Sequence, residues 1–440
     1  MNMLFVRCSS FVVLGLLGVC AFAANEAPGT KNQEQPSGPY RPEAGKFPEL
    51  AKAHTYRGEL VFVDHVNRRG SLRVLGVGVF RRNDPHPFAM LPYGMIRYHG
   101  APADLRDIPL GTILHVTAYL PPDPKLSSVP VLPVDNRNRD ANHRRGVGVF
   151  PAENHALLIE DEASFCLRTG QTWKLKEVDL QDPQALLLAT LEPTQGGKGK
   201  AGEQKLSFDN ATRVWRGREC LTIADMVAEG IWPAAGKKSL GGQSSLLNLA
   251  WKPTPSGVFL RYHVTDIWLD NEASQRAAEL QTENHKAFMR SRWLPGWVDA
   301  IEYGKFGRAT VTVTLFGGMD ASLYADFKKE GLTLMNSAEN TLKHTEAGTA
   351  GPSQMAARGK ILDIIQSSHT PPMGSSGIQL RLEIDLITEG IRPGKVVRIK
   401  PAGWPDVQLP REEYINGSGS ASPSDLLQER FPTPAIFPKY

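Results

Sequence analysis

Cysteine and catalytic sequence signatures are both scarce in this chain. Its 440 residues contain four cysteines, and no two of them form a C-x-x-C pair. Cysteines this few and this scattered provide neither a thiolate metal cage nor a dithiol redox centre. The zincin H-E-x-x-H, the phosphate-binding G-x-x-x-x-G-K-S/T, the G-x-S-x-G elbow and the EF-hand loop are missing as well. The sequence therefore predicts no cofactor and no catalytic residue, and it favours binding over catalysis.

Net charge and long apolar runs are also limited. The formal charge at pH 7 is +4, which indicates no general attraction to nucleic acid or to anionic membranes. Beyond residue 23, no segment is apolar enough to span a bilayer, which takes about 20 such residues. We therefore expect no nucleic-acid partner and no transmembrane span.

The N-terminus has the pattern of a secretory signal peptide. Arg7 is the only charged residue in this segment, an apolar stretch covers residues 11–22, and Ala21-Phe22-Ala23 is a small-x-small cleavage box. This order of features predicts removal of residues 1–23 and a periplasmic or secreted protein. The apolar stretch is too short for a membrane anchor. A lipoprotein anchor at Cys20 is disfavoured because Val19 precedes it instead of a small residue.

Polar segments rich in glycine and proline flank the remainder of the chain. Residues 24–47 show no periodicity and are predicted to be a flexible linker. Residues 404–440 are predicted to be a disordered tail. Two Phe-Pro pairs near the end, at Phe431 and Phe437, leave open the alternative of a short docking peptide.

Between these ends, a pattern of short alternating strands and glycine turns recurs. The first copy is the clearest, with strands expected at 57–64, 71–75 and 112–119. Later copies are looser, although residues 310–315 and 378–386 alternate apolar and polar side chains, as a half-buried strand does. Short strands with glycine turns favour closed barrels, which leave no exposed strand edges. We therefore predict a mainly β protein with about three tandem small barrels, at 48–124, 166–270 and 295–403, and a connecting segment at 125–165.

One helix is predicted between the second and third barrels, at 271–294. Asn271 is a candidate N-cap, and Ala273, Ala277, Leu280, Ala287 and Phe288 lie near one helical face. Arg290 and Arg292 suit the negative C-terminal end of the helix dipole. This helix would link or brace the two barrels.

The first copy resembles small OB-like β-barrel domains of exported bacterial proteins of unknown function. The residues that carry the resemblance lie within 55–120, and they are Gly58, Gly100, Leu105, Asp107, Ile108, Gly111, Leu114 and Val116. Only a few positions match in the second copy (Gly217, Leu221, Asp225) and in the third (Gly394, Val396, Val397). The resemblance implies an OB-like fold and no particular activity, because such barrels host many unrelated functions.

Three groups of residues are candidates for binding or crosslinking. Arg137, Arg139, Arg144 and Arg145 form a basic loop that could hold an acidic polysaccharide or another anion, although a solvated loop is the alternative. Glu153 and His155 could both ligate a metal from one strand face, whereas a polar turn is the simpler interpretation. Cys166 and Cys220 form a disulfide or remain two free thiols, and the sequence leaves both open.

Two pairs of carboxylates beside tryptophans suggest a second functional class. Asp266 and Asp270 flank Trp268, and Asp299 and Glu302 follow Trp297. Paired acids at a defined separation can hydrolyse glycosides, so a polysaccharide-active hydrolase is the alternative. The preferred hypothesis is an exported, non-enzymatic binding or scaffold protein. Its expected partner is an unknown protein or polysaccharide of the cell envelope.

Overall fold

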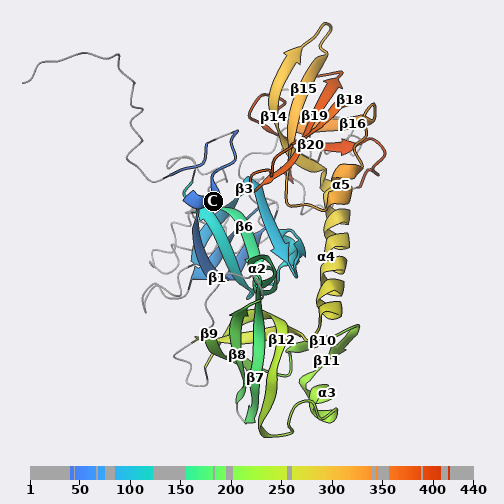
Figure 1. Cartoon of the computed structure of the whole chain (residues 1–440). Coiled ribbons are helices and arrows are strands. Elements are labelled where there is room, and N and C mark those ends of the chain that lie inside the picture. The colour runs from blue at the N-terminus through green and yellow to red at the C-terminus, as the bar shows by residue number, and fades with distance from the viewer. Residues whose placement is uncertain are drawn as a thin grey trace, which may run out of the picture. The chain divides into compact units, whose positions relative to one another are not determined.

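The computed structural model describes most of the chain after residue 39. The described residues are 40–43, 45–65, 68–74, 85–121, 154–181, 184–194, 202–254, 260–337, 343–344, 356–387, 390–407 and 415–416. They fold mainly into β-strands, most of which belong to three sheets, here named A, B and C in chain order (Figure 1). The prediction of a mainly β protein with small closed barrels is confirmed for sheets A and C. The basic loop, Glu153 and the signal segment lie outside the described residues.

Sheet A is a closed barrel in which the last strand lies between two earlier ones. The order is β2-β1-β5-β6-β3, and pairing of β2 with β3 completes the ring. β6 runs parallel to β3, whereas the other neighbours are antiparallel. The elements are η1 Leu50–Lys52, β1 His54–Asp64, β2 Arg69–Val74, β3 Pro85–Tyr98, β4 Ala101–Pro102, η2 Leu105–Asp107, β5 Ile113–Tyr119 and β6 Asn154–Asp161.

The segment predicted to connect the first two barrels, 125–165, contributes a strand to sheet A. β6 lies within it, and so does the start of helix α2, Glu162–Thr169. All residues of β6 after Asn154 are buried, so the strand shows no alternation. A short apolar run that is buried on both faces shows no alternation of apolar and polar residues. Its sequence therefore does not indicate which sheet the strand joins. Only the pairing with β3 and β5 assigns it.

Sheet B has the order β11-β10-β13-β12-β7-β8-β9. β9 also pairs in parallel with β13, at Ser207 and His263. Residues 236–243 are the first part of β12 and pair with β7 across an irregularity between Ser239 and Gln243. The elements are β7 Gln171–Gln181, β8 Gln184–Pro193, β9 Gly202–Phe208, β10 Arg213–Arg216, β11 Glu219–Leu221, α3 Ile223–Ala228, β12 Gly236–Pro253 and β13 Leu260–Trp268.

Sheet C is a closed barrel of six strands, all antiparallel to their neighbours. The order is β14-β15-β19-β18-β16-β20. The alternation predicted for 310–315 is seen in β15, where every second side chain is buried. The elements are β14 Leu294–Tyr303, β15 Ala309–Phe316, α5 Ala321–Ala325, β16 Leu332–Ser337, β18 Ala357–Gln366, β19 Ser375–Ile384 and β20 Val396–Pro401, besides a small parallel pair of β17 Lys343–His344 and β21 Ile415–Asn416.

The tail predicted from residue 404 begins inside the third barrel. Trp404 is 8% exposed and belongs to the core of sheet C. Its indole nitrogen donates to Asp326, and its backbone oxygen accepts from the buried amine of Lys400. The residues after Trp404 are mostly polar, so the sequence analysis assigned Trp404 to the tail and missed this contact.

The predicted helix is present as α4, Asn271–Arg292. Its buried face is partly the one expected, because Ala273 is buried and Phe288 packs against the core of sheet C, whereas other positions differ. Asp270, and not Asn271, caps it by accepting from the backbone nitrogen of Ala273. Leu280 is 58% exposed, whereas Gln281 and His285 are buried. The side-chain amide of Gln281 donates to Asp107 of sheet A, 3.0 Å away. Within the described residues, α4 and the other helices are too short or too polar to cross a membrane.

An aromatic cluster connects sheets A and C. Tyr93 of β3, Trp297 of β14 and Phe316 of β15 are nearly fully buried, and Phe47 packs among them. The rings of Phe47 and Trp297 lie 4.4 Å apart, and those of Tyr93 and Trp297 lie 5.5 Å apart. Burial of large rings with edge contacts stabilises this junction, next to which a pocket opens.

Candidate functional site

Three arginines from separate parts of the chain line one pocket. Arg68 lies just before β2, Arg292 ends α4, and Arg398 lies in β20. The enclosed space is about 70 Å³. One ordered water needs about 10–15 Å³ by this measure, so the space admits several waters or a small oxyanion.

Backbone carbonyl groups hold two of these arginines in place. Arg68 donates to the carbonyl oxygens of Pro92, at 3.0 Å, and Gly94, at 2.7 Å. Arg398 donates to the backbone oxygens of Arg292 and Trp293, at 3.0 and 3.2 Å. The second pair of bonds satisfies carbonyl groups at the C-terminus of α4, where a cation is favourable. Both guanidinium groups are thereby fixed before a ligand arrives.

The pocket is electropositive. Burial, together with the neighbouring charges of Arg68 and Arg292, lowers the pKa of Arg398 to about 10. Burial also lowers the pKa of Arg68, against the opposing influence of Asp104. Among the described lining residues, Asp104 is the one carboxylate beside three guanidinium groups. An anion would relieve this repulsion between like charges.

Three buried nitrogen atoms of the pocket residues have no hydrogen-bond partner among the described residues. They are the Nε of Arg398, the Nδ1 of His285 and the Nε2 of His65. His285 is 4% exposed, and burial lowers its pKa, so the neutral ring is favoured. A neutral ring with hydrogen on Nδ1 can donate one hydrogen bond. Unpartnered buried donors are costly, which makes an oxyanion with several acceptors a fitting ligand.

Apolar side chains complete the lining. Tyr93 and Met95 come from β3, Phe288 and Met289 from α4, and Phe316 from β15. A few polar groups in an apolar wall is the usual composition of a small-molecule site. The arrangement can fix an anionic group, whereas its lining residues include no serine, threonine or cysteine that would act as a nucleophile.

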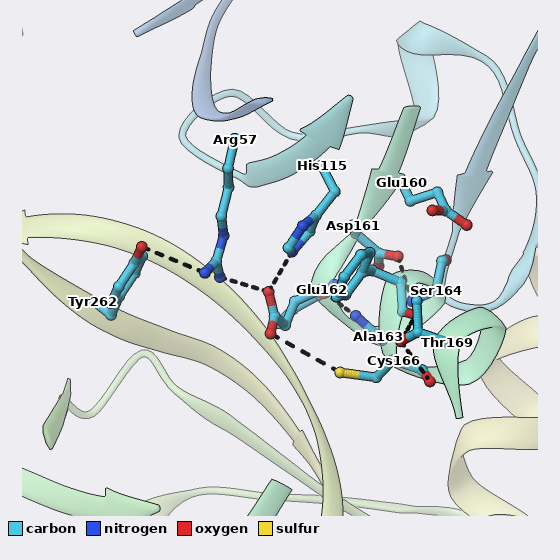
Figure 2. A network of polar contacts seen from close by, with 12 residues as sticks. Arg57, His115, Glu160, Asp161, Glu162, Ala163, Ser164, Cys166, Thr169 and Tyr262 are labelled. Carbon is cyan, nitrogen blue, oxygen red and sulfur yellow. Dashed lines mark hydrogen bonds and ion pairs between the residues drawn. The ribbon is translucent and has the colours of Figure 1, made fainter. Parts of the chain in front are cut away.

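A second polar centre lies where sheet A, α2 and sheet B meet (Figure 2). The carboxylate of Glu162, in the first turn of α2, is 1% exposed on its side chain. It accepts from Arg57 at 2.5 Å, from His115 at 2.7 Å and from the indole of Trp173 at 3.2 Å. Burial alone would raise the pKa of Glu162, but Arg57 and His115 outweigh burial, and the net pKa is lowered.

The two acidic residues before Glu162 are also buried, and their carboxylates also accept hydrogen bonds from protein donors. Glu160 accepts two hydrogen bonds from Arg168, at 2.7 and 2.8 Å. Asp161 caps α2 by accepting from the backbone nitrogen of Ser164, and it also accepts from that of His99. Each carboxylate accepts hydrogen bonds from protein donors, so this centre ties sheet A to α2 and sheet B.

A serine, a histidine and an aspartate line up in sheet B, although the sequence suggested no such set. The hydroxyl of Ser207 lies 3.2 Å from Nδ1 of His263, whose Nε2 lies 3.6 Å from Asp209. The hydroxyl also lies 3.3 Å from the backbone oxygen of Tyr262, an acceptor for its hydrogen. Burial lowers the pKa of His263 to about 4. Ser207 is 8% exposed. It pairs with His263 where β9 meets β13, so this row of side chains joins the two strands that close the sheet.

Among the predicted site residues that the structure describes, none lines the arginine pocket. His155 is fully buried in β6, and burial lowers its pKa to about 4. No metal-binding cluster is present among the described residues. Glu153 lies outside them, so the Glu153–His155 metal site stays a prediction. Cys166 is buried in α2 and Cys220 is exposed on β11. Both are free thiols in the structure, which is the second of the two alternatives that the sequence left open.

The four carboxylates suggested for a hydrolase have separate structural partners. Asp266 is buried and binds Arg213 and the indole of Trp215. Asp270 caps α4, and Asp299 accepts from Thr314 and Gln379. Glu302 pairs with Arg381. Within the described part of the chain, none of the four lines the arginine pocket.

The sequence analysis missed the pocket because its arginines have no motif spacing. The sequence analysis explained Arg292 by the negative C-terminal end of the helix dipole, and this explanation does not indicate a role in binding. Only the structure singles out Arg68, a bulky residue with φ of 50° in a turn of sheet A. Positive φ in a residue other than glycine is uncommon and often marks a functional or strained position.

Comparison of the chain with protein-family models, with curated proteins and with solved structures finds no match. The functional argument therefore depends on the geometry of this chain alone.

Proposed function

We propose that this is an exported, non-enzymatic binding protein of the cell envelope that holds an anionic ligand in its arginine pocket. The observation that carries the proposal is the convergence of Arg68, Arg292 and Arg398 on one enclosed space with a single carboxylate. Phosphate, sulfate and carboxylate groups match guanidinium donors in geometry and charge. Export is supported by the sequence pattern of residues 1–23.

An OB-like fold for sheets A and B supports a binding role. In chain order, the five main strands of each sheet follow the order 1-2-3-5-4, and the third strand runs parallel to the fifth. OB folds have five strands in a Greek-key barrel and commonly bind polymers on one face. Sheet C is outside this part of the proposal, since all of its neighbouring strands are antiparallel.

The alternative of a polysaccharide hydrolase is weaker. Glycoside hydrolysis needs two carboxyl groups that face the same bond, one of which is free to give up a proton. Asp266 and Asp270 are held by structural donors in sheet B and at the start of α4. Asp299 and Glu302 lie on the outside of sheet C, hydrogen-bonded to neighbouring strands.

The proposal is tested by anion-dependent stabilisation. Thermal unfolding is measured with inorganic phosphate, sulfate or chloride at matched ionic strength, with isothermal titration of any anion that stabilises. A ligand at 100 times its Kd stabilises by about 2.7 kcal/mol, so a specific anion raises the unfolding midpoint clearly. Arg292→Gln should abolish the effect, and Arg216→Gln, an exposed arginine of sheet B, should keep it. Equal midpoints in phosphate, sulfate and chloride would reject the pocket as an anion site.

Export is tested on its own. N-terminal sequencing of the protein from the envelope fraction should begin at Ala24. A sequence that begins at Met1 would reject it, whatever the anion measurements give.

A further inference from the structure

The hairpin that joins β14 to β15 exposes aromatic side chains. Phe306 is 98% exposed and Tyr303 is 74% exposed, the two highest values among the large apolar side chains described as exposed. Leu332, which is 67% exposed, lines a surface hollow of sheet C together with Arg308. Isolated exposed apolar residues are normal, but several at one end of a barrel point to a contact surface.

The backbone of this hairpin is unusual for the residue that it carries. Phe306 has φ of 57° and Gly307 has φ of 76°. The backbone nitrogen of Arg308 donates to the oxygen of Lys305, which closes a turn around these two central residues. Turns with two positive φ values favour asparagine or aspartate followed by glycine, and they disfavour a bulky side chain at the first position.

The stability of the fold does not account for Phe306. A side chain that is 98% exposed buries almost no area against the protein, so it gains nothing from packing. Its left-handed backbone is costly for a large residue. A residue that is strained and also unpacked points to a contact made outside the chain.

Basic side chains flank the aromatic tip. Lys305 is exposed beside Phe306, and the side chain of Arg308 is 68% exposed. The nearest acid to Arg308, Glu383, lies at 4.0 Å and is itself about half exposed. Aromatic rings with neighbouring cations suit the interface of a bilayer with anionic headgroups. This is a local feature that the small net charge of the whole chain does not reveal.

We propose that the 303–308 hairpin docks on an anionic lipid surface, with Phe306 and Tyr303 inserted between headgroups and Lys305 and Arg308 paired with their charges. The contact is peripheral, because only a turn enters the bilayer. It is independent of the arginine pocket, whose lining includes no residue of this hairpin.

The test is co-sedimentation of the mature protein with vesicles. Vesicles of phosphatidylcholine with about one third phosphatidylglycerol should bind it, and vesicles of phosphatidylcholine alone should bind it weakly. Phe306→Asn should weaken binding about tenfold, the order expected for withdrawing one aromatic side chain from an apolar environment. The same change should leave the thermal midpoint equal or higher, because Asn-Gly is a favoured pair for this turn.

Two further variants sharpen the result. Lys305→Glu should lower binding to the anionic vesicles, since it reverses a charge at the interface. Leu280→Gln replaces an exposed leucine of α4 and should change nothing. The proposal is overturned if the wild type stays unbound, if Phe306→Asn binds as well as the wild type, or if Phe306→Asn lowers the midpoint. Capture of a protein partner by the tip without vesicle binding also overturns it.

Discussion

Arg57 reaches 2.5 Å from the buried carboxylate of Glu162 while its guanidinium carbon lies 4.7 Å from the ring centre of Tyr262. One side chain of β1 in sheet A thus contacts both the start of α2 and the strand β13 of sheet B (Figure 2). The carboxylate is inaccessible to water, and the arginine keeps about a quarter of its surface exposed. Removal of either partner would leave a buried group without compensation.

Glu162→Leu should therefore destabilise the protein by about 3 kcal/mol, because Arg57, His115 and Trp173 lose their common acceptor. The measurement is urea unfolding of the mature protein at neutral pH. Glu229→Gln, which removes an exposed partner of Arg216, serves as the control and should leave the unfolding midpoint nearly unchanged. A Glu162→Leu variant as stable as the wild type would show that the network is dispensable.

The buried histidines should make the protein sensitive to mild acid. The pKa values of His155 and His263 are lowered to about 4, whereas an unfolded histidine titrates near 6.5. The unfolded chain therefore binds protons first as the pH falls, so stability is full above pH 6.5 and is lost between 6.5 and 4. Each group accounts for about 3 kcal/mol over that window.

Urea unfolding at several values between pH 7.5 and 4.5 measures this dependence. His155→Asn should reduce the slope of unfolding free energy against pH by about one proton below pH 6. His369→Asn, at an exposed position, is the control and should preserve the slope. Glu162 does not interfere with this measurement, because its contribution to the free energy of unfolding is lost only in stronger acid, as the pH falls through its lowered folded pKa. A wild-type stability that is flat down to pH 4.5 would contradict the burial of these rings.

The thiols of Cys166 and Cys220 should differ in reactivity. Burial raises the pKa of the Cys166 thiol well above its usual range, and the nearby Glu162 raises it further. Cys220 is exposed on β11, although its pKa is raised as well. Native protein that begins at Ala24 should label at one cysteine, and protein unfolded without reductant should label at two. Cys220→Ser should remove the native labelling, and absence of labelling in the unfolded wild type would show a disulfide.

The local sequence pattern was enough to predict the features that depend on residues adjacent in the chain. The alternation in 310–315 predicted the half-buried strand β15, and the composition of 271–294 predicted α4. The predicted inward face of α4 was only partly right, because Ala273 is buried as expected but Gln281 and His285 are buried as well, Gln281 with a hydrogen bond to Asp107 of sheet A. A hydrophobic periodicity cannot anticipate a polar interface.

By itself, the sequence determined the mainly β character and a helix, predicted at 271–294, because side-chain period and capping are properties of adjacent residues. The export signal that its charge order indicates stays a prediction. Tertiary structure alone decided that β6 belongs to sheet A and that Arg68, Arg292 and Arg398 meet around one space. These residues lie far apart along the chain, so their approach depends on strand pairing and barrel closure. Long-range pairing leaves no spacing in the sequence from which the pocket could be predicted.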